Sequence, residues 1–327
     1  MRSKMRCSKN TQKFPSVCIV IPNWNGKSIL RKCLKMLLRT DYPNFKIVVV
    51  DDRSTDGSSE MVKREFPSVI LLQNKKRLGL PKSSNIGLKY AFDHLKSEYV
   101  VVLGNDTMTF QRSWLSKLVR ALQLPRVGIV APQLISLEGK IQHVGYSYEP
   151  SMYLGLDILR KKRAKNPSAF YEVDAVMCPM MIRREVAEEI GLFDEVFTPF
   201  YSEDHDYCFR AKKAGWKILY VGSAKCIHYG SYTLSKVVES ENFRRRNMFI
   251  FLWRYFSKSP LFILALFYSL ITSIIAPQDP SKPMFPRNFK LRKEPYRNLL
   301  MTMKALRDAL RLKDIYLIPR IKRRTRS

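Results

Sequence analysis

Residues 47–57 constrain the fold of this chain more than any other segment, and they read Ile-Val-Val-Val-Asp-Asp-Arg-Ser-Thr-Asp-Gly. An apolar, mostly β-branched run without alternation is typical of a strand that is buried on both faces of a sheet. The run ends in Asp51 and Asp52, and a turn of small polar residues follows. Because open α/β sheets bind ligands at the carboxyl ends of their strands, the segment predicts a ligand site at Asp51. A helix cap is the alternative, but it explains residues 54–56 better than Asp51.

Strand and helix patterns alternate along the first part of the chain, and short links join them. We expect strands at 17–21, 47–50, 69–72, 99–103, 127–133, 173–182 and 218–221, and helices at 28–38, 58–65 and 83–95. This alternation predicts an α/β fold with a mostly parallel sheet and helices on both faces. Residues 145–172 fit no element, so we expect a substrate loop there.

The composition adds a strong positive charge, since 58 Lys and Arg residues outnumber 28 Asp and Glu residues and give a formal net charge of +30. Such a surface favours polyanions, namely nucleic acid, anionic lipid or phosphorylated substrates. In the C-terminal third the basic residues lie among apolar and aromatic ones, and no nucleic-acid-binding motif is present. We therefore expect an anionic membrane surface as a partner and no nucleic acid.

Charge and composition divide the chain into a basic N-terminal arm (1–15), an α/β domain (16–240) and a basic, apolar helical extension (241–327). Residues 261–276 carry no charge but are shorter than the roughly 20 residues that span a bilayer, so we favour shallow insertion over a span. This organisation predicts a cytoplasmic protein, peripheral or monotopic at the inner face of the plasma membrane.

One segment of the extension has the spacing of an amphipathic helix. Its apolar stripe comprises Tyr296, Leu299, Leu300, Met303, Leu306 and Leu310. Basic residues occupy the rest of the helix, which predicts that it lies on anionic lipid. A helix packed against the protein is the alternative.

Two further groups of residues carry chemistry. Ser202 suits a helix N-cap, which would place Glu203 and Asp204 in the first turn, where the helix dipole favours carboxylates. That benefit is also a purely structural explanation for the acids.

Asp106 follows one expected strand and His228 follows another, and a carboxylate with an imidazole suits Mg²⁺ or Mn²⁺. A structural histidine is the alternative for His228.

Taken together, these motifs resemble glycosyltransferase family 2 enzymes, whose fold is the GT-A nucleotide-diphospho-sugar transferase fold. The matching segments are 20–26, 51–57, 77–79, 85–87, 103–107, 191–195, 203–206, 215–216 and His228. They cover roughly residues 16–230 in the family's order, and the likeness is greatest to the rhamnosyltransferase-like branch. The resemblance implies a mostly parallel, Rossmann-like sheet followed by a basic, membrane-associating helical extension.

The resemblance also implies a role for each matching residue. Asp51 would accept the N3–H of a uracil or thymine ring, and Asp106 with His228 would bind a divalent metal, Mg²⁺ or Mn²⁺, that bridges the donor diphosphate. Asp204 would be the general base, and Glu203 would position the acceptor or the helix. The remaining residues implied to bind the nucleotide-sugar are Pro22, Asn23, Asn25, Arg77, Asn85 and Asn105.

The expected activity is metal-dependent, inverting transfer of a sugar from a UDP- or dTDP-sugar to a hydroxyl of a glycan or lipid-linked acceptor. Gly104 stands where the family often has the first acid of its D-x-D metal motif, which we interpret as variation within this branch. A catalytically silent module that binds a glycan or partner and a basic nucleic-acid-binding protein are alternatives. A nucleotidyltransferase is a third, but no Gly-rich, Lys-containing phosphate loop lies near the first expected strand.

Overall fold

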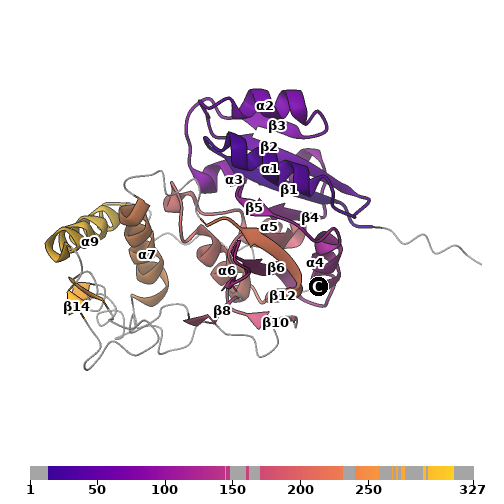
Figure 1. The fold of residues 1–327 in the computed structure, drawn as a ribbon. Coiled ribbons are helices and arrows are strands. Elements are labelled where there is room, and N and C mark those ends of the chain that lie inside the picture. Colours follow the sequence, from indigo (N-terminus) through magenta and orange to yellow (C-terminus); the bar gives the residue numbers. More distant parts are fainter. Residues whose placement is uncertain are drawn as a thin grey trace, which may run out of the picture.

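The computed structural model describes residues 14–143, 145–147, 160–161, 170–230, 240–257, 267, 270–271, 274–276, 290–291 and 294–312. These residues form a layered α/β body with a pair of helices, α7 and α9, beside it (Figure 1). The main sheet contains β1 (Val17–Asn23), β2 (Phe45–Asp51), β3 (Ile70–Gln73), β4 (Tyr99–Val102), β5 (Thr107–Met108), β6 (Val127–Ile135), β7 (Ile141–His143), β10 (Phe170–Val173), β11 (Met180–Arg183) and β12 (Lys217–His228).

Helices cover both faces of this sheet, and further helices, α7 and α9, lie beside it (Figure 1). The helices are α1 (Lys27–Leu37), α2 (Ser58–Glu65), α3 (Leu80–Lys89) with a π-helical turn (Tyr90–His94), α4 (Trp114–Leu122), α5 (Arg184–Ile190), a 3₁₀ turn η3 (Glu195–Phe197), α6 (Glu203–Lys213), α7 (Ser240–Phe256) and α9 (Pro295–Leu310). Two small separate ladders pair β8 (Tyr146–Ser147) with β9 (Arg160–Lys161) and β13 (Ile275–Ala276) with β14 (Lys290–Leu291).

The sheet order is β10-β12-β6-β11-β4-β1-β2-β3, with β5 paired to β12 and β7 to β6. The first four strands lie side by side in the order β3-β2-β1-β4, and each runs parallel to its neighbours. Strand β6 runs parallel to β12. Antiparallel β11 joins these two parallel groups. The prediction of an α/β fold with a mostly parallel sheet is therefore confirmed, and the sheet becomes mixed in its second half.

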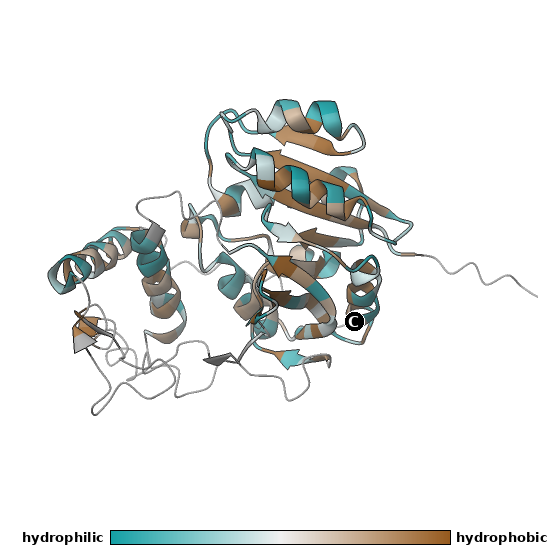
Figure 2. Cartoon of the chain, viewed as in Figure 1, coloured by the Kyte–Doolittle hydropathy of each residue, from teal (hydrophilic) through white to brown (hydrophobic). Residues whose placement is uncertain are grey.

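Side chains of the central strands alternate between two hydrophobic cores, so the strands appear as continuous apolar bands (Figure 2). Ile19 enters the core under α1, α2 and α4, whereas Cys18 and Val20 enter the core under α3, α5 and α6. Full burial of one such side chain contributes roughly 1.5–3 kcal/mol. The core between β1 and α3 is tightly packed, because a Cβ at Gly87 of α3 would lie 2.2 Å from Val20 Cγ1. Any larger residue there would push α3 away from β1.

Two strand predictions were wrong in extent. The expected strand 173–182 is two strands, β10 beside β12 and β11 between β4 and β6. Pro179 lies just before β11, and proline cannot donate a ladder hydrogen bond in the middle of a strand. The expected strand 218–221 is longer, because β12 continues past an irregularity between Val221 and Lys225. His228 is therefore the last residue of β12 and does not follow it at a distance.

The predicted substrate loop 145–172 lies largely outside the described residues. Its described part contains the β8–β9 ladder and the start of β10. The N-terminal arm is described only from residue 14. Whether the chain divides into the three predicted domains stays a prediction, although α7 contacts the cavity described below.

Helix α9 packs against α7 through small residues and leaves its larger apolar ones exposed. Thr302, Ala305 and Ala309 are buried against α7, and Arg245 of α7 donates a hydrogen bond to Thr302. On the predicted stripe, Tyr296 is 73% exposed and Met303 is 55% exposed. The alternative of a helix packed on the protein thus holds for one face, while much of the stripe remains open. Among the described residues, no helix combines the length and apolar character that a membrane span requires.

Candidate functional site

The carboxyl ends of β1, β2 and β4 open onto a cavity of about 400 Å³. Residues 199–202, the first turn of α6, the end of β12 and one face of α7 contribute to its walls. This is the position at which parallel α/β sheets bind ligands. The predicted site residues that line the cavity are Pro22, Asn23, Arg77, Asn105, Asp106, Glu203, Asp204 and His228.

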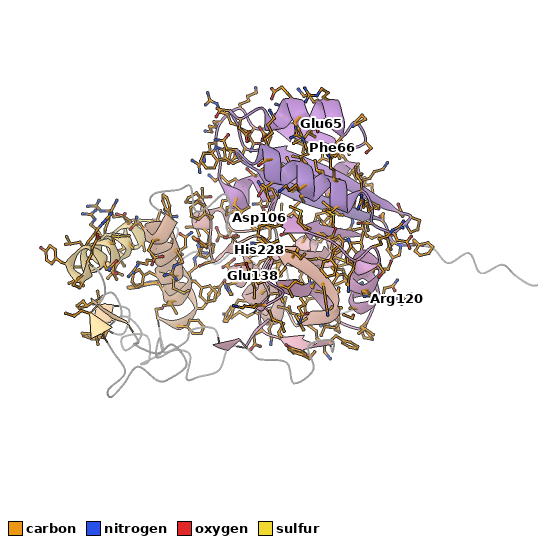
Figure 3. The ribbon with its side chains drawn as sticks, viewed as in Figure 1. Glu65, Phe66, Asp106, Arg120, Glu138 and His228 are labelled. Atoms are coloured by element: carbon orange, nitrogen blue, oxygen red, sulfur yellow. The ribbon has the colours of Figure 1, made fainter. Side chains whose placement is uncertain are left out.

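Asp106 and His228 face each other at this cavity (Figure 3). The ladder between β5 and β12 pairs Thr107 with His228 and so brings the two side chains together. Asp106 Oδ1 and His228 Nε2 are 3.6 Å apart, which is longer than an ordinary hydrogen bond. Two atoms that each lie about 2 Å from one cation are separated by about 3–3.5 Å. The pair therefore has nearly the spacing of two ligands of a single cation.

Gln142 of β7 orients the His228 ring. Its Oε1 lies 3.0 Å from His228 Nδ1, and its Nε2 donates to the His228 carbonyl at 3.3 Å, which fixes the direction of the amide. A neutral ring then donates from Nδ1 and turns the Nε2 lone pair toward the Asp106 carboxylate. Two electron-rich atoms face each other in this way when a proton or a cation lies between them. Metal-binding histidines commonly have such a partner on the other ring nitrogen.

No third His, Cys, Asp or Glu joins this pair within the described parts of the chain. A bound cation would therefore take its remaining ligands from substrate oxygens and water. Gly104 contributes space, because a Cβ at this position would lie 2.9 Å from Asp106 Oδ1. A larger residue at position 104 would require the Asp106 carboxylate to shift.

A buried chain of polar side chains connects β4 to β2 behind the cavity wall. Asn105 Nδ2 donates to Asn23 Oδ1 at 2.8 Å, and Asn23 Nδ2 donates to Asp51 Oδ1 at 3.1 Å. Asp51 Oδ2 accepts the backbone N–H of Ser54 at 3.0 Å. A Cβ at Gly26 would lie 2.3 Å from Asn105 Nδ2, so glycine leaves room for this chain. Asp51 itself does not line the cavity, and it holds Asn23 from behind.

Asp52 shapes a neighbouring loop. Its carboxylate accepts the backbone N–H groups of Leu78 at 2.7 Å and Gly79 at 2.8 Å. These bonds fix the loop that carries Arg77, whose guanidinium carbon lies 3.4 Å from the centroid of the Trp24 ring. The stacked pair gives the cavity wall a flat cationic surface suited to planar or anionic groups.

Glu203 and Asp204 begin α6 as predicted, but the predicted side-chain cap is absent. Ser202 occupies the N-cap position with φ of 71° and makes no capping hydrogen bond. Glu203 is 6% exposed, and its Oε2 has no hydrogen-bond partner in the described part of the chain. Burial, and secondarily the charge of Asp204, raises the pKa of Glu203 to about 8. Glu203 is therefore mostly protonated at neutral pH, beside the Asp204 carboxyl group in the cavity wall.

Two other predicted residues lie outside the cavity. Asn85 Nδ2 donates to the Phe193 carbonyl at 2.9 Å, and Asn85 Oδ1 accepts the Phe193 N–H at 3.0 Å. Asn25 Oδ1 accepts the N–H of Thr55 at 2.8 Å. Both amides thus join segments around the site, and direct contact of either with a nucleotide-sugar stays a prediction.

Sequence reasoning missed some residues that line the cavity, namely Trp24, Asp52, Tyr201, Arg244 and Met248. Trp24 and Asp52 lie within the matching segments 20–26 and 51–57, and Tyr201 lies two residues before Glu203, so each had a usable signal in the sequence. Arg244 and Met248 lie four residues apart on α7, which was assigned to the extension. No motif distinguishes them, and none distinguishes Gln142.

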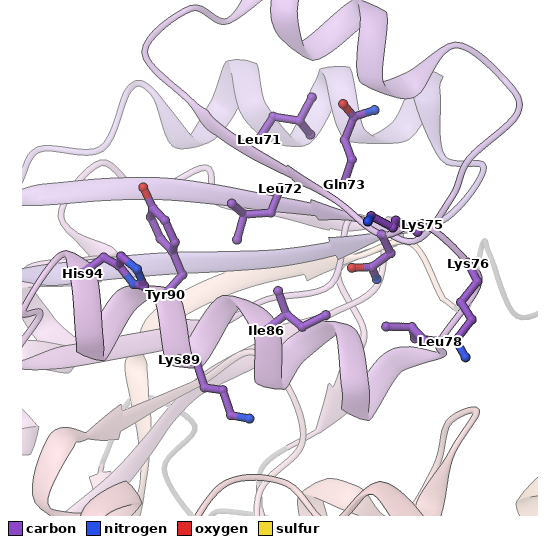
Figure 4. Close-up of a pocket in the computed structure, with 11 residues that line it drawn as sticks. Leu71, Leu72, Gln73, Lys75, Lys76, Leu78, Ile86, Lys89, Tyr90 and His94 are labelled. Atoms are coloured by element: carbon purple, nitrogen blue, oxygen red, sulfur yellow. The ribbon is translucent and has the colours of Figure 1, made fainter.

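A second, more open depression lies between the edge strand β3 and α3 (Figure 4). Leu71, Leu72, Tyr90 and His94 line it together with lysines, and it shares no lining residue with the first cavity. It contains no carboxylate. The first cavity is therefore the one of the two in which carboxylates lie beside a histidine.

The sequence pattern of glycosyl transferase family 2 matches residues 18–191, which is more than half of the chain. Among curated relatives, O-antigen biosynthesis protein RfbC of Myxococcus xanthus is 27% identical over 227 residues, which are 66% of this chain and 17% of RfbC. Low-salt glycan biosynthesis hexosyltransferase Agl10 of Haloferax volcanii is 24% identical over 207 residues, 63% of this chain and 65% of Agl10. This chain therefore matches only a small part of the length of RfbC.

Solved structures share the fold at low sequence identity. GalNAc-T7 with UDP, GalNAc and Mn²⁺ has a TM-score of 0.58 and 18% identity, covering 80% of this chain and 52% of that one. Residues 1–349 of S. aureus TarS have a TM-score of 0.55 and 15% identity, covering 90% of this chain and 81% of that one. The fold class predicted from the sequence, a GT-A fold, is thereby confirmed. From its sequence pattern and its fold, the chain belongs to glycosyl transferase family 2.

Proposed function

We propose that this chain is a metal-dependent, inverting glycosyltransferase that moves a sugar from a UDP- or dTDP-sugar to a hydroxyl of a glycan or lipid-linked acceptor. The observation that carries the proposal is one cavity lined by the Asp106–His228 pair and by Asp204. Family membership supports the reaction class.

Asp106 and His228 would hold the divalent cation, Mg²⁺ or Mn²⁺. The 3.6 Å separation and the Gln142 contact support this assignment. When bound there, the cation would offset the negative charge that builds up on the leaving nucleoside diphosphate. Arg77, stacked on Trp24, provides a second positive charge at the same cavity.

Asp204 would act as the general base, taking the proton from the acceptor hydroxyl as that oxygen attacks the anomeric carbon. Its neighbour Glu203 supports this division of roles, because a neutral carboxyl group can donate a hydrogen bond but is a poor base. With one base and direct attack opposite the leaving group, the configuration at the anomeric carbon would invert.

Asp51 would select a pyrimidine base. Asp51 lies behind Asn23, and each of its carboxylate oxygens has a further lone pair beyond the bonds to Asn23 and Ser54, so it could accept a ring N–H once the Asn23 amide moves aside. Asn23 and Asn105, which line the cavity in front of it, would contact the nucleoside.

The exposed stripe of α9 supports docking on an anionic membrane surface at the cytoplasmic side. Leu300 and Leu310 are about half exposed, and Lys304 and Arg307 on the same helix are exposed basic residues. Docking would raise the local concentration of a lipid-linked acceptor near the cavity.

The test is release of UDP or dTDP from UDP-glucose, UDP-GlcNAc, UDP-galactose and dTDP-rhamnose, with Mg²⁺ or Mn²⁺ and with a chelator. We expect cation-dependent release from at least one donor, and inversion when the product anomer is assigned by NMR. Nucleotide-sugar binding without any release or transfer would favour the catalytically silent module. Full activity in excess chelator would remove the metal from the proposal.

A further inference from the structure

The segment 197–202 comes directly before α6, and its residues 199–202 form a wall of the cavity. Pro199, Phe200 and Tyr201 line the cavity, and α6 begins two residues after Tyr201. Tyr201 and Ser202 both have left-handed backbone conformations, with φ of 76° and 71°. Residues with a side chain disfavour this region, so the turn needs contacts elsewhere to hold it.

Asn247 of α7 supplies those contacts. It is fully buried, and its Nδ2 donates to the carbonyl oxygens of Phe197 at 2.6 Å, Phe200 at 2.7 Å and Tyr201 at 3.1 Å. Its Oδ1 accepts a hydrogen bond from Arg246 Nε at 2.9 Å, which fixes the orientation of the amide. One side chain thus spans the whole turn.

The same helix holds the chain on both sides of the turn. Before it, Arg254 Nη1 lies 2.5 Å from Asp194 Oδ2. After it, Tyr255 donates to Asp206 Oδ1 at 2.6 Å. Arg246 also donates to the Thr198 carbonyl, so loss of the Asn247 contacts would loosen the turn at Phe200 and Tyr201 and leave the fold in place.

The other side of the turn meets the loop that carries Arg77. The Leu80 N–H donates to the Pro199 carbonyl at 2.7 Å, and a Cβ at Gly79 would lie 2.8 Å from Pro199 Cα. The turn therefore lies between the loop held by Asp52 and helix α7. A shift of the turn would move the start of α6, and with it the Asp204 carboxylate.

We propose that Asn247 is a positioning residue of the transfer reaction: its amide fixes the left-handed turn that places Asp204 at the acceptor side of the cavity. This inference rests on the proposed function, because it assigns Asn247 an effect through Asp204. Helix α7, assigned to the extension from sequence, then belongs functionally to the catalytic site.

The test compares Asn247→Ala and the milder Asn247→Ser with Asn242→Ala. Asn242 is a matched control, because it is also a buried asparagine of α7, and its Oδ1 has no hydrogen-bond partner among the described residues. Release of UDP or dTDP from the four donors named above gives kcat and KM. Calorimetry with UDP and Mn²⁺ gives the affinity for the nucleotide, and its binding stoichiometry gives the folded fraction of each protein. Hydrogen exchange reports the mobility of residues 198–206.

For Asn247→Ala we expect a fall in kcat of about tenfold to a hundredfold, since a displacement of about 1 Å can cost a hundredfold. Asn247→Ser should lose less. UDP–Mn²⁺ affinity and stoichiometry should stay within about twofold of the original protein, and exchange should accelerate in residues 198–206. Asn242→Ala should match the original protein in all of these. Unchanged exchange in 198–206, or unchanged kcat, would overturn the inference.

A double-mutant cycle with Asp204→Asn separates positioning from a general structural effect. If Asn247 acts through Asp204, adding Asn247→Ala to Asp204→Asn should lower the residual rate by less than about twofold. An equal loss on both backgrounds would contradict the inference. If Asp204→Asn alone leaves the rate unchanged, the proposed function has failed. If it abolishes turnover while Asn247→Ala has no effect, only this inference has failed.

Discussion

The two sides of the cavity are built in different ways. On the side of β1, β2 and β4, the polar residues lie at or just beyond the strand ends: Asn23 and Asp51 end β1 and β2, and Asp106 lies in the short link between β4 and β5. On the opposite side, the turn before Asp204 depends on Asn247, about 50 residues further along the chain. The first side follows from local sequence, whereas the second exists only because α7 packs against it.

The two sides also differ in what surrounds them. Apolar cores cover both faces of the strands, so hydrophobic burial stabilises the side of the cavity formed by β1, β2 and β4. Around α6 and α7, charged and polar groups are themselves buried, including Asp206 and Arg210, which are both 0% exposed. A buried polar network is stabilising only while every member keeps its partners. We therefore expect mutations on the side of β1, β2 and β4 to change nucleotide or cation binding. Mutations on the side of α6 and α7 should change turnover or stability.

The largest expected effect is that of Asp204→Asn, which tests whether the α6 side carries the chemistry. The amide keeps the size of the side chain but cannot accept the acceptor proton, so transfer should fall by about 10²–10⁴-fold. UDP–Mn²⁺ binding, measured by calorimetry, should persist because the donor side is untouched. Near-normal transfer by a folded variant would place the base elsewhere.

Arg210→Leu should mainly reduce stability. Arg210 Nε lies 2.8 Å from Asp206 Oδ2, and the guanidinium also donates to the carbonyls of Ile190 and Leu192. Removing one member of a buried ion pair costs about 3–5 kcal/mol, which urea unfolding would measure. The control Arg31→Leu breaks a more exposed pair with Glu65 and should change the free energy of unfolding much less. Equal losses in the two variants would contradict the distinction between the buried and exposed pairs.

Gln142→Leu should weaken cation binding on the donor side. Loss of the contact to His228 Nδ1 leaves the ring free to rotate. Mutation of a residue that holds a metal ligand in this way typically lowers the metal affinity by about 10–100-fold. The concentration of Mn²⁺ required for half-maximal activity should rise by this factor, with little change in kcat at saturating Mn²⁺. An unchanged Mn²⁺ requirement would mean that Gln142 does not support a metal ligand.

Glu203→Gln should change how stability depends on pH. Because burial raises the folded-state pKa of Glu203 from an ordinary 4.5 to about 8, the folded protein binds the extra proton more tightly than the unfolded chain. The free energy of unfolding should therefore fall as pH rises between about 4.5 and 8, by at most about 1.4 kcal/mol per pH unit from this group. Glu203→Gln should remove this contribution and gain stability relative to the original protein toward pH 8. Parallel stability curves for the two proteins would show that the group does not titrate in this range.

The smallest expected effect concerns the exposed stripe on α9. The double variant Leu300→Asp/Met303→Asp changes exposed side chains, so it should fold normally and bind anionic vesicles about tenfold more weakly. The control Leu38→Asp/Leu124→Asp changes exposed side chains of the α/β body and should retain binding. Sedimentation with phosphatidylglycerol vesicles at two salt concentrations would measure both. If both double variants bind like the original protein, α9 does not dock on lipid.

The α/β architecture and the edge of the sheet at which the cavity lies could both be predicted from the amino-acid sequence. Buried parallel strands read as apolar runs, and the residues that follow them must lie at the same edge of the sheet. This is why Asp106 could be expected at this edge from the strand pattern, whereas Asn23 and Asn105 were expected from the family resemblance. The start of α6 at Glu203 was also predictable from local pattern, even though the expected side-chain cap by Ser202 did not form.

The hydrogen-bond partners of these residues became known from the three-dimensional fold. It placed Asp51 behind Asn23, assigned Asn85 to the Phe193 backbone, and brought Gln142 to the ring of His228. It also made α7 a wall of the cavity through Arg244 and Met248. The physical reason is that strand order, side-chain periodicity and helix starts follow from neighbouring residues. Hydrogen bonds between distant segments depend instead on how helices such as α7 pack, and a single sequence carries no local signal for that packing.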